Sequence, residues 1–323
     1  MIVERTIPLE PPRNRDATSP GTAVGGAAAR DAVRIDLQLE LQYEVGEGGA
    51  SFVFCIHAAQ TACQAVRQEH LQLSQSIPAR LQRDPQTDTR HLRLRAPPGD
   101  LRVSYRATVD LMHRFDAPDD LREVAVDDLP LEAVRYIYPS RYCESDRLSD
   151  FAFSLFGQIP SGYRRVSAIR DWVNQHVRFE SNSSNSATSA CDTIFAKRGV
   201  CRDFAHVMIA MCRALTIPAR FATGTDYGAD PALGPPDFHA YVEVFIGDRW
   251  YIFDPSGTAI PMGLVRIATG RDAADVAFAT MFGTVKAHAP IIRAYALDDA
   301  AHGFVLPVHV TAALSSDGDA HGR

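Results

Sequence analysis

The stretch Gly199-Val-Cys-Arg-Asp-Phe-Ala-His-Val-Met-Ile-Ala-Met-Cys-Arg-Ala-Leu215 decides the fold of the C-terminal half of this 323-residue chain. Its large apolar side chains recur at a spacing of 3.6 residues, which predicts a helix with one apolar face. Those side chains are Phe204, Val207, Met208, Met211, Cys212 and Leu215. The helix is predicted to begin at Cys201, because Gly199 and Val200 suit a helix interior poorly. It is predicted to end before Pro218, which cannot continue it.

Short strands are predicted to follow this helix. Residues 219–224 have a strand composition, and after a Pro-rich loop that contains Pro231 the strand pattern returns over residues 239–246 and 249–254. Helical spacing also predicts helices over residues 166–176 and 189–197. The sequence therefore predicts an α+β fold, in which the helix that begins at Cys201 packs on an antiparallel sheet.

The pair Gly247-Asp248 has the composition of a two-residue hairpin turn. Such a turn pairs Ile246 with Arg249, so that the numbers of paired residues sum to 495. Because side chains alternate along a strand, Asp254 and His239 then lie on one face as diagonal neighbours. A three-residue turn would place them on opposite faces.

Cys201 is predicted to lie at the N-terminus of its helix, where unpaired N–H groups and the helix dipole favour a thiolate. His239 opens a strand, where its ring can reach the thiol. His206 lies on the same helix as Cys201 but about 140° around its axis, so we expect it to point away and pack. Cys201, His239 and Asp254 are therefore the candidate catalytic residues.

These three residue types fit nucleophilic catalysis. The thiolate would attack a carbonyl and form a thioester, His239 would protonate the leaving amine, and Asp254 would hold the imidazole tautomer. The backbone N–H of Cys201 is the expected oxyanion donor. Candidates for a second donor lie in the loop Ser183–Ser186. Plainer interpretations stay open: a cysteine that only packs, a turn-forming Asp before Pro255, and ordinary loop chemistry for the serines.

The N-terminal half shows a period of two instead. Apolar and polar residues alternate from about residue 32 to residue 113, as in Val33-Arg-Ile-Asp-Leu-Gln-Leu39, which predicts half-buried strands of a small β-sandwich. No catalytic constellation is visible in this half. Residues 270–275, Gly-Arg-Asp-Ala-Ala-Asp, are predicted to be a capped helix start with a structural role.

Composition excludes several classes of protein. The chain carries 33 Lys and Arg against 39 Asp and Glu, so a net charge of −6 gives no argument for a nucleic-acid partner. No run of about 18 apolar residues and no signal-like N-terminus is present, which predicts a cytoplasmic protein without a membrane partner. Six cysteines do not form a disulfide framework, and the spacing Cys201-x4-His206-x5-Cys212 does not suit zinc. No metal and no cofactor is expected.

The chain resembles the bacterial transglutaminase-like cysteine enzymes. The segments that carry the resemblance are Gly199–His206, Cys212–Leu215, Ile217–Arg220, Asp237–Val244, Trp250–Pro255 and Gly270–Asp275. The N-terminal half is similar, more loosely, to the small β domain that often precedes this core in bacterial members. The resemblance implies a papain-like core and a Cys–His–Asp triad at Cys201, His239 and Asp254, with Asp203 and His206 in structural roles.

Composition and periodicity predict the organisation of the chain, and the resemblance implies its activity. We expect a disordered tail over 1–30, a β-sandwich domain over 31–115, a connector over 116–150, a catalytic domain over 151–314 and a second tail over 315–323. The expected function is cysteine-dependent acyl transfer at peptide or carboxamide bonds of a protein or peptide substrate. Two alternatives are a catalytically silent scaffold and an acyltransferase for small substrates.

The sequence departs from the family pattern in two loops. Family members often carry a Tyr and a Pro-Gly before the nucleophile, where this chain has Phe179 and Ser181-Asn182, and the usual Gly-Tyr is Gly224-Thr225 here. Substrate specificity is therefore not implied by the resemblance.

Overall fold

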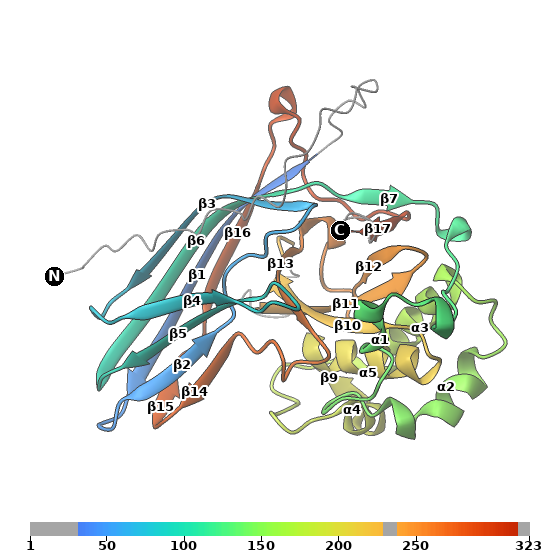
Figure 1. The fold of residues 1–323 in the computed structure, drawn as a ribbon, viewed down its shortest axis with the longest axis horizontal. Helices are drawn as coiled ribbons and strands as arrows, with labels where there is room; N and C mark the ends of the chain where they lie inside the picture. The colour runs from blue at the N-terminus through green and yellow to red at the C-terminus, as the bar shows by residue number, and fades with distance from the viewer. Residues whose placement is uncertain (1–31, 229–237, 316–323) are drawn as a thin grey trace.

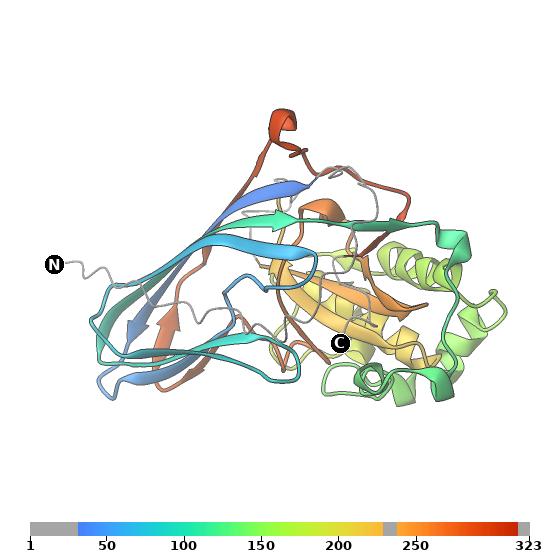
Figure 2. The same cartoon turned by 45° about the horizontal axis from the view of Figure 1, so that its top comes forward.

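The computed structural model describes residues 32–228 and 238–315. The predicted tails, except for Ser315, and the loop around Pro231 lie outside the described residues. Figures 1 and 2 show a β-sandwich on one side and, on the other, a smaller sheet covered by helices.

The sandwich consists of two antiparallel sheets. One has the order β15-β1-β6-β3, with β16 also paired to β1, and the other has the order β14-β2-β5-β4. Their bounds are β1 (Val33–Val45), β2 (Ala50–Phe54), β3 (Gln64–Leu73), β4 (Ala79–Arg83), β5 (Arg90–Ala96), β6 (Gly99–Leu111), β14 (Ala279–Phe282), β15 (Val285–Ala287) and β16 (Ile291–Leu297).

The predicted period of two is confirmed in β1, one of the two longest strands of this part. Along β1, Val33, Ile35, Leu37 and every second residue to Val45 are buried, while the residues between them are partly or fully exposed. Their partners across the interior include Phe52 of the second sheet. The alternation therefore predicts the buried residues of β1 correctly, because each sheet of the sandwich buries one of its faces.

Three strands from the C-terminal part complete the sandwich. The range 151–314 was predicted as the catalytic domain, but β14 pairs with β2, and β15 and β16 pair with β1. Without them, one edge of β1 and one edge of β2 would present unpaired backbone groups. Residues 279–297 thus lie in the sheets of the N-terminal part.

The second part of the molecule has a four-stranded antiparallel sheet in the order β12-β11-β10-β13. The bounds of its strands are β10 (Ala219–Thr225), β11 (Phe238–Ile246), β12 (Arg249–Phe253) and β13 (Val265–Gly270). The helices are α1 (Leu131–Val134), α2 (Ser149–Phe156), α3 (Tyr163–His176), α4 (Ala190–Ala196) and α5 (Cys201–Ala214). Two short pairs complete the described strands: β7 (Arg114–Asp116) with β17 (Ala313–Ser315), and the parallel pair β8 (Arg178–Phe179) with β9 (Arg198–Gly199).

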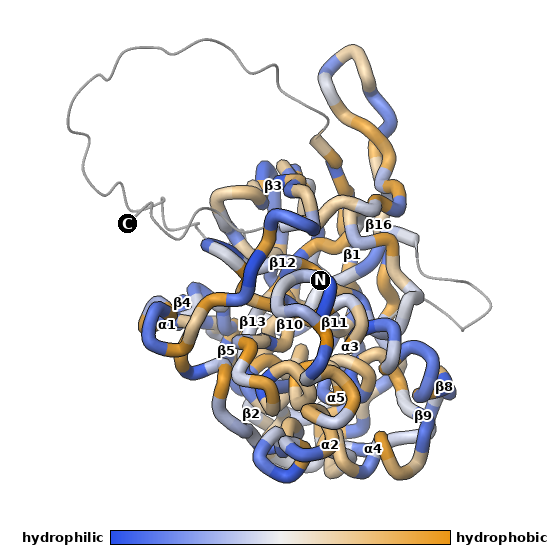
Figure 3. The backbone as a smooth tube through the Cα atoms, turned by 90° about the vertical axis from the view of Figure 1, so that its right-hand side faces the viewer, coloured by the Kyte–Doolittle hydropathy of each residue, from blue (hydrophilic) through white to orange (hydrophobic). Residues whose placement is uncertain are grey.

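Helix α5 begins at Cys201 and ends before Pro218, as predicted. Every residue from Asp203 to Arg213 is buried, because β10 and β11 cover one side of the helix while α2, α3 and α4 cover others. Figure 3 shows α5 between the sheet and helices α2 and α4. The charge of Arg213 is accommodated by bonds to backbone oxygens, among them Ala219 O at 2.8 Å and Arg271 O at 2.6 Å.

The predicted helix start at residues 270–275 is wrong. The chain makes a turn there after β13. Asp272 accepts from the backbone N–H of Tyr142 at 3.0 Å and of Ala274 at 2.9 Å, and Asp275 pairs with Arg271. The carboxylates therefore satisfy a turn rather than the first turn of a helix, since no apolar periodic segment follows them.

Candidate active site

Cys201 is the first residue of α5 and its side chain is half-buried. The start of the helix is fixed by Asp203, whose Oδ2 accepts from the Val200 backbone N–H at 2.9 Å. A Cβ on Gly199 would lie 2.7 Å from the Cβ of Asp203, so only glycine fits there. The Gly-Val-Cys-Arg-Asp sequence thus places the sulfur at the end of the helix where backbone N–H groups lack partners.

The loop before the nucleophile is attached to α5 by Arg202. Its guanidinium donates to the carbonyl oxygen of Asn185 at 2.8 Å and to Oγ of Ser184 at 3.3 Å. It also contacts the Asp203 carboxylate at 3.0 Å. The loop Ser183–Ser186, where a second oxyanion donor was sought, therefore lies beside the start of the helix, and which of its groups would donate stays a prediction.

The hairpin between β11 and β12 has the predicted register. Ile246 pairs with Arg249, and each pair down to Val242 and Phe253 keeps the sum of 495. The next pair in this register would join Tyr241 to Asp254, on the face that His239 shares. The two-residue turn therefore decides on which side of the sheet the carboxylate emerges.

The structure brings Cys201, His239 and Asp254 together. Nε2 of His239 lies 3.3 Å from Oδ1 of Asp254, and the exposed fractions of these two side chains are 9% and 3%. Cys201 is close enough to raise the pKa of His239, and its Sγ lies 3.9 Å from the carbonyl oxygen of Phe238, the residue before the histidine. The imidazole thus interacts with both the sulfur and the carboxylate.

The carboxylate of Asp254 is held by three further donors. Its Oδ1 accepts from the backbone N–H of Ser256 at 3.0 Å and from Oγ of Ser256 at 2.6 Å, and its Oδ2 accepts from Ala259 N–H at 2.9 Å. Nδ2 of Asn174 on α3 donates to the carbonyl oxygens of Pro255 and Ser256 at 3.2 and 3.0 Å. The turn after β12 is therefore tied both to the carboxylate and to a helix.

Burial and charge shift the pKa values of His239 and Asp254 in opposite directions. Burial alone lowers the pKa of His239, but the charges and hydrogen bonds of Asp254 and Cys201 outweigh it and hold that pKa well above the ordinary value of 6.5. Burial raises the pKa of Asp254, yet its interactions with His239, Ser256 and Ala259 leave that pKa below 3.8. The geometry therefore favours an imidazolium facing a carboxylate.

His206 is packed away from this group, as predicted. It is fully buried, its ring stacks on Tyr142 at 5.0 Å, and its Nε2 accepts from the backbone N–H of Ala273 at 3.2 Å. Burial lowers the pKa of His206 well below 6.5, so this ring is neutral. It joins α5 to the turn after β13.

Sequence reasoning missed Asp226, a buried acid beside the imidazole. It follows β10, in which Gly224 pairs with His239. Burial raises its pKa, although backbone N–H groups of Gly228 and Ile260 and the charge of His239 oppose the shift. The β10–β11 register would have placed it near the site, but this pairing does not follow from a tight turn, because the connection between the strands is long.

Sequence reasoning also missed how the sandwich supports the sheet. The Gln64 side chain bonds the backbone of Arg266 on both sides: Nε2 donates to its carbonyl oxygen and Oε1 accepts from its N–H, both at 2.8 Å. Arg266 pairs with Gly224, and Gly224 pairs with His239. Gln64, a residue of the N-terminal part, therefore holds β13. This strand is separated from β11, the strand of His239, by β10 alone.

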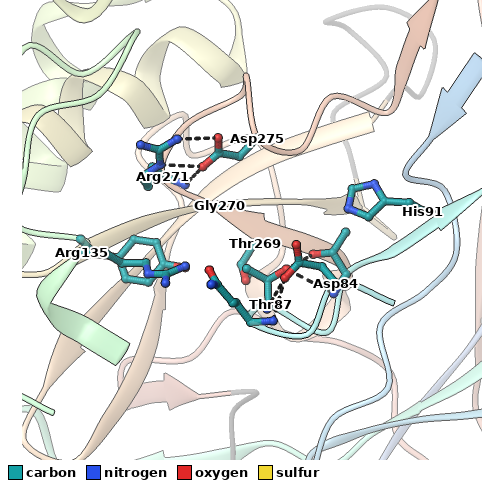
Figure 4. A pocket seen from close by; sticks show the side chains of 11 residues that line it. Asp84, Thr87, His91, Arg135, Thr269, Gly270, Arg271 and Asp275 are labelled. Carbon is teal, nitrogen blue, oxygen red and sulfur yellow. Dashed lines mark hydrogen bonds and ion pairs between the residues drawn. The ribbon is translucent and has the colours of Figure 1, made fainter. Parts of the chain in front are cut away.

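A polar cavity of about 440 Å³ lies elsewhere, between the β4–β5 hairpin and the end of β13 (Figure 4). It is lined by Asp84, Gln86, Thr87, Thr89, His91, Arg135, Tyr136, Thr269, Gly270, Arg271 and Asp275. Neither the sulfur, the imidazole nor the carboxylate of the candidate site reaches it. The chemistry described above is therefore not assigned to this cavity.

The sequence predicted neither a metal site nor a membrane-spanning helix. Among residues 32–228 and 238–315, three or more His, Cys, Asp or Glu side chains are nowhere gathered as a metal site would need. No helix in the described part of the chain is long and apolar enough to cross a membrane.

With the fold and the site in view, comparisons with known proteins define the class. The sequence profile of the transglutaminase-like superfamily matches residues 149–255, and that of the bacterial transglutaminase N-terminal domain matches residues 33–132. The crystal structure of a candidate cysteine protease from Cytophaga hutchinsonii is 38% identical, covers 88% of this chain and 98% of its own, and superposes with a TM-score of 0.82.

The chain therefore belongs to the transglutaminase-like superfamily, with the α+β core and the preceding β domain that the sequence predicted. Among curated proteins, an uncharacterized protein of Mycobacterium leprae is 28% identical over 119 residues, which is 35% of this chain and 42% of the relative. An uncharacterized protein of Mycobacterium tuberculosis is 30% identical over 125 residues, 34% and 40% respectively. The chain thus matches about two fifths of the length of these relatives.

Proposed function

We propose that the protein is a cysteine-dependent acyl-transfer enzyme that acts on peptide or carboxamide bonds through a thioester at Cys201. The observation that carries the proposal is one imidazole that interacts with both the Cys201 thiol and the Asp254 carboxylate, with Nε2 of His239 at 3.3 Å from Oδ1 of Asp254. The likeness to a candidate cysteine protease supports the same class of chemistry.

Each residue has a distinct part in this mechanism. The thiolate of Cys201 attacks the carbonyl carbon and forms a C–S bond, while the carbonyl oxygen gains the negative charge and lies at the N-terminus of α5. When the C–N bond breaks, the imidazolium of His239 gives its proton to the leaving amine. Asp254 stabilises that imidazolium and fixes the ring, and does not itself take the proton.

The second half of the reaction releases the acyl group. Neutral His239 takes a proton from water or from an acceptor amine, whose oxygen or nitrogen attacks the thioester, and the C–S bond breaks to restore the thiolate. Water gives a carboxylic acid and an amine gives a new amide. Both outcomes use the same three side chains, so the acceptor distinguishes a hydrolase from a transferase.

Thiol reactivity tests the proposal without a known substrate. Cys191 is half-buried like Cys201 but sits on α4, and burial raises the pKa of its thiol. We expect iodoacetamide at low concentration to label Cys201 at least about tenfold faster than Cys191, because only the former has an imidazolium beside it. Peptide mapping by mass spectrometry measures both rates in one sample.

Two variants complete the experiment. Cys201→Ala should abolish turnover of a peptide or carboxamide library, whereas Cys191→Ala should leave it intact. Product analysis with and without a fluorescent primary amine separates hydrolysis from transfer. Equal labelling rates for the two cysteines, with no turnover, would favour a catalytically silent scaffold instead.

A further inference from the structure

An aromatic pair stands beside the candidate nucleophile. The carbonyl oxygen of Phe238 is 3.9 Å from Sγ of Cys201, and the ring of Phe238 stacks on that of Phe278 with centroids 4.5 Å apart and planes 14° from parallel. Phe278 therefore stacks on the residue whose backbone contacts the sulfur, although it lies 77 residues further along the chain than Cys201. The side chain of Phe278 remains 37% exposed, and Phe238 is half-buried.

The position of Phe278 is set by the sandwich. Its carbonyl oxygen accepts from the backbone N–H of Cys55 at 3.0 Å, and the next residue, Ala279, pairs with Phe54 of β2. Figure 1 shows the chain leaving β13 in the smaller sheet and entering β14 in the sandwich, so this ring belongs to the segment that joins the two parts. The backbone of Phe278 is thus bonded to the sandwich at the residue directly before β14.

We propose that the exposed face of Phe278, backed by Phe238, is an apolar subsite that receives an apolar side chain flanking the reacting carbonyl of the substrate. The inference rests on the proposed function and adds the substrate class, a peptide or carboxamide with an aliphatic or aromatic side chain next to the bond. A substrate must bring its carbonyl to Cys201, and its neighbouring groups then cover nearby surface. Covering an exposed aromatic face removes apolar area from water, which favours apolar partners over polar ones.

The exposed ring of Phe282 does not share this placement. Phe282, at the far end of β14, is 61% exposed, pairs with Ser51 of the sandwich and has no ring stacked on it in the described structure. It is the last residue of β14, four residues after Phe278, so it is a matched control for a change of ring to hydroxyl.

Two alkylating reagents with one reactive group test the subsite. N-benzyl iodoacetamide and N-(2-hydroxyethyl) iodoacetamide react with thiols in the same way but carry an apolar or a polar group a few bonds from the reacting carbon. The measured quantity is the ratio of their second-order rate constants at Cys201, divided by the same ratio at Cys191 in the same sample. We expect this normalised ratio to be about ten in the natural protein, the usual discrimination of one apolar contact.

The variants decide the outcome. Phe278→Ser should lower the normalised ratio about fivefold or more. Phe278→Leu should keep most of the ratio, and Phe282→Ser should keep all of it. A ratio near one in the natural protein, or no change in Phe278→Ser, overturns the subsite while fast labelling of Cys201 still supports the proposed function. Slow labelling of Cys201 by both reagents overturns the proposed function and the subsite together. Thermal unfolding of each variant shows whether it folds, and the Leu variant retains packing if the Ser variant does not.

Discussion

Replacing Asp254 by Asn tests the electrostatics of the site most directly. Two unit charges 3.3 Å apart, the separation of Nε2 of His239 and Oδ1 of Asp254, attract by about 5 kcal/mol at an effective dielectric constant of about 20. Burial of the ring opposes this attraction, and the pKa of His239 is nevertheless held well above 6.5. Asp254→Asn keeps the shape of the side chain and removes its charge. The carboxylate then no longer opposes the effect of burial on the imidazole, so the pKa of His239 should fall.

The same change should reduce turnover by roughly 10²- to 10⁴-fold, because the imidazolium loses its stabilising charge and the ring loses its fixed tautomer. A further cost comes from Ala259, whose N–H donates to Oδ2 and would face the amide NH2 of the new side chain. Ser256→Ala is the matched control, since it removes a donor to the same carboxylate without changing its charge.

The stability of the pair depends on pH in a defined direction. His239 has a raised pKa in the folded protein, so its contribution is complete below about pH 6.5 and is lost as the pH rises through the folded-state pKa. Asp254 has a lowered pKa, so its contribution is present above about pH 3.9 and is lost as the pH falls through the folded-state pKa. The difference in unfolding free energy between the natural protein and Asp254→Asn should therefore be largest near pH 5–6 and shrink in alkali.

Two measurements check this reasoning. NMR of labelled imidazole follows the titration of His239, and urea unfolding at several pH values follows the stability difference. If His239 titrates at the same pH in Asp254→Asn as in the natural protein, or if the stability difference is independent of pH, the electrostatic account of the site is refuted.

Two further predictions concern the support of the sheet. A Cβ on Gly224 would lie 2.2 Å from the carbonyl oxygen of Val265, so Gly224→Ala should destabilise the protein by about 2–4 kcal/mol in urea unfolding. Gly48→Ala is the control: Gly48 has open space around it, so this change should alter stability by less than about 0.5 kcal/mol. Equal effects of the two changes would contradict the close approach at Gly224. Gln64→Leu leaves the buried N–H of Arg266 without its partner and should cost about 1–3 kcal/mol, and an unchanged unfolding midpoint would show that the bridge does not stabilise the joint.

Local patterns were sufficient for the elements that carry the candidate site. The start of α5 at Cys201 follows from Gly199 and Val200, which suit a helix interior poorly, and from the apolar period that comes directly after them. The facing of His239 and Asp254 follows from a two-residue turn, because such a turn fixes the register of the whole hairpin. In both cases the deciding interactions are short-range in sequence.

The sandwich was only partly predictable. The alternation along β1 identified its buried face, but no local signal shows that residues 279–297 return to pair with β1 and β2. The choice of partner for a strand depends on which exposed edge is available in the folded molecule. The turn at residues 270–275 was mistaken for a helix start for a different reason: Asp caps both kinds of structure.

The sequence by itself determined a thiol at a helix end, an imidazole opening a strand and a carboxylate in register with it, because each depends on neighbours along the chain. Only the tertiary structure decided what surrounds them: Asp226 beside the imidazole, Gln64 bracing β13, and Phe278 stacked on Phe238. These contacts join residues that are distant in the chain, and their proximity arises from the packing of two sheets whose pairing no local periodicity encodes.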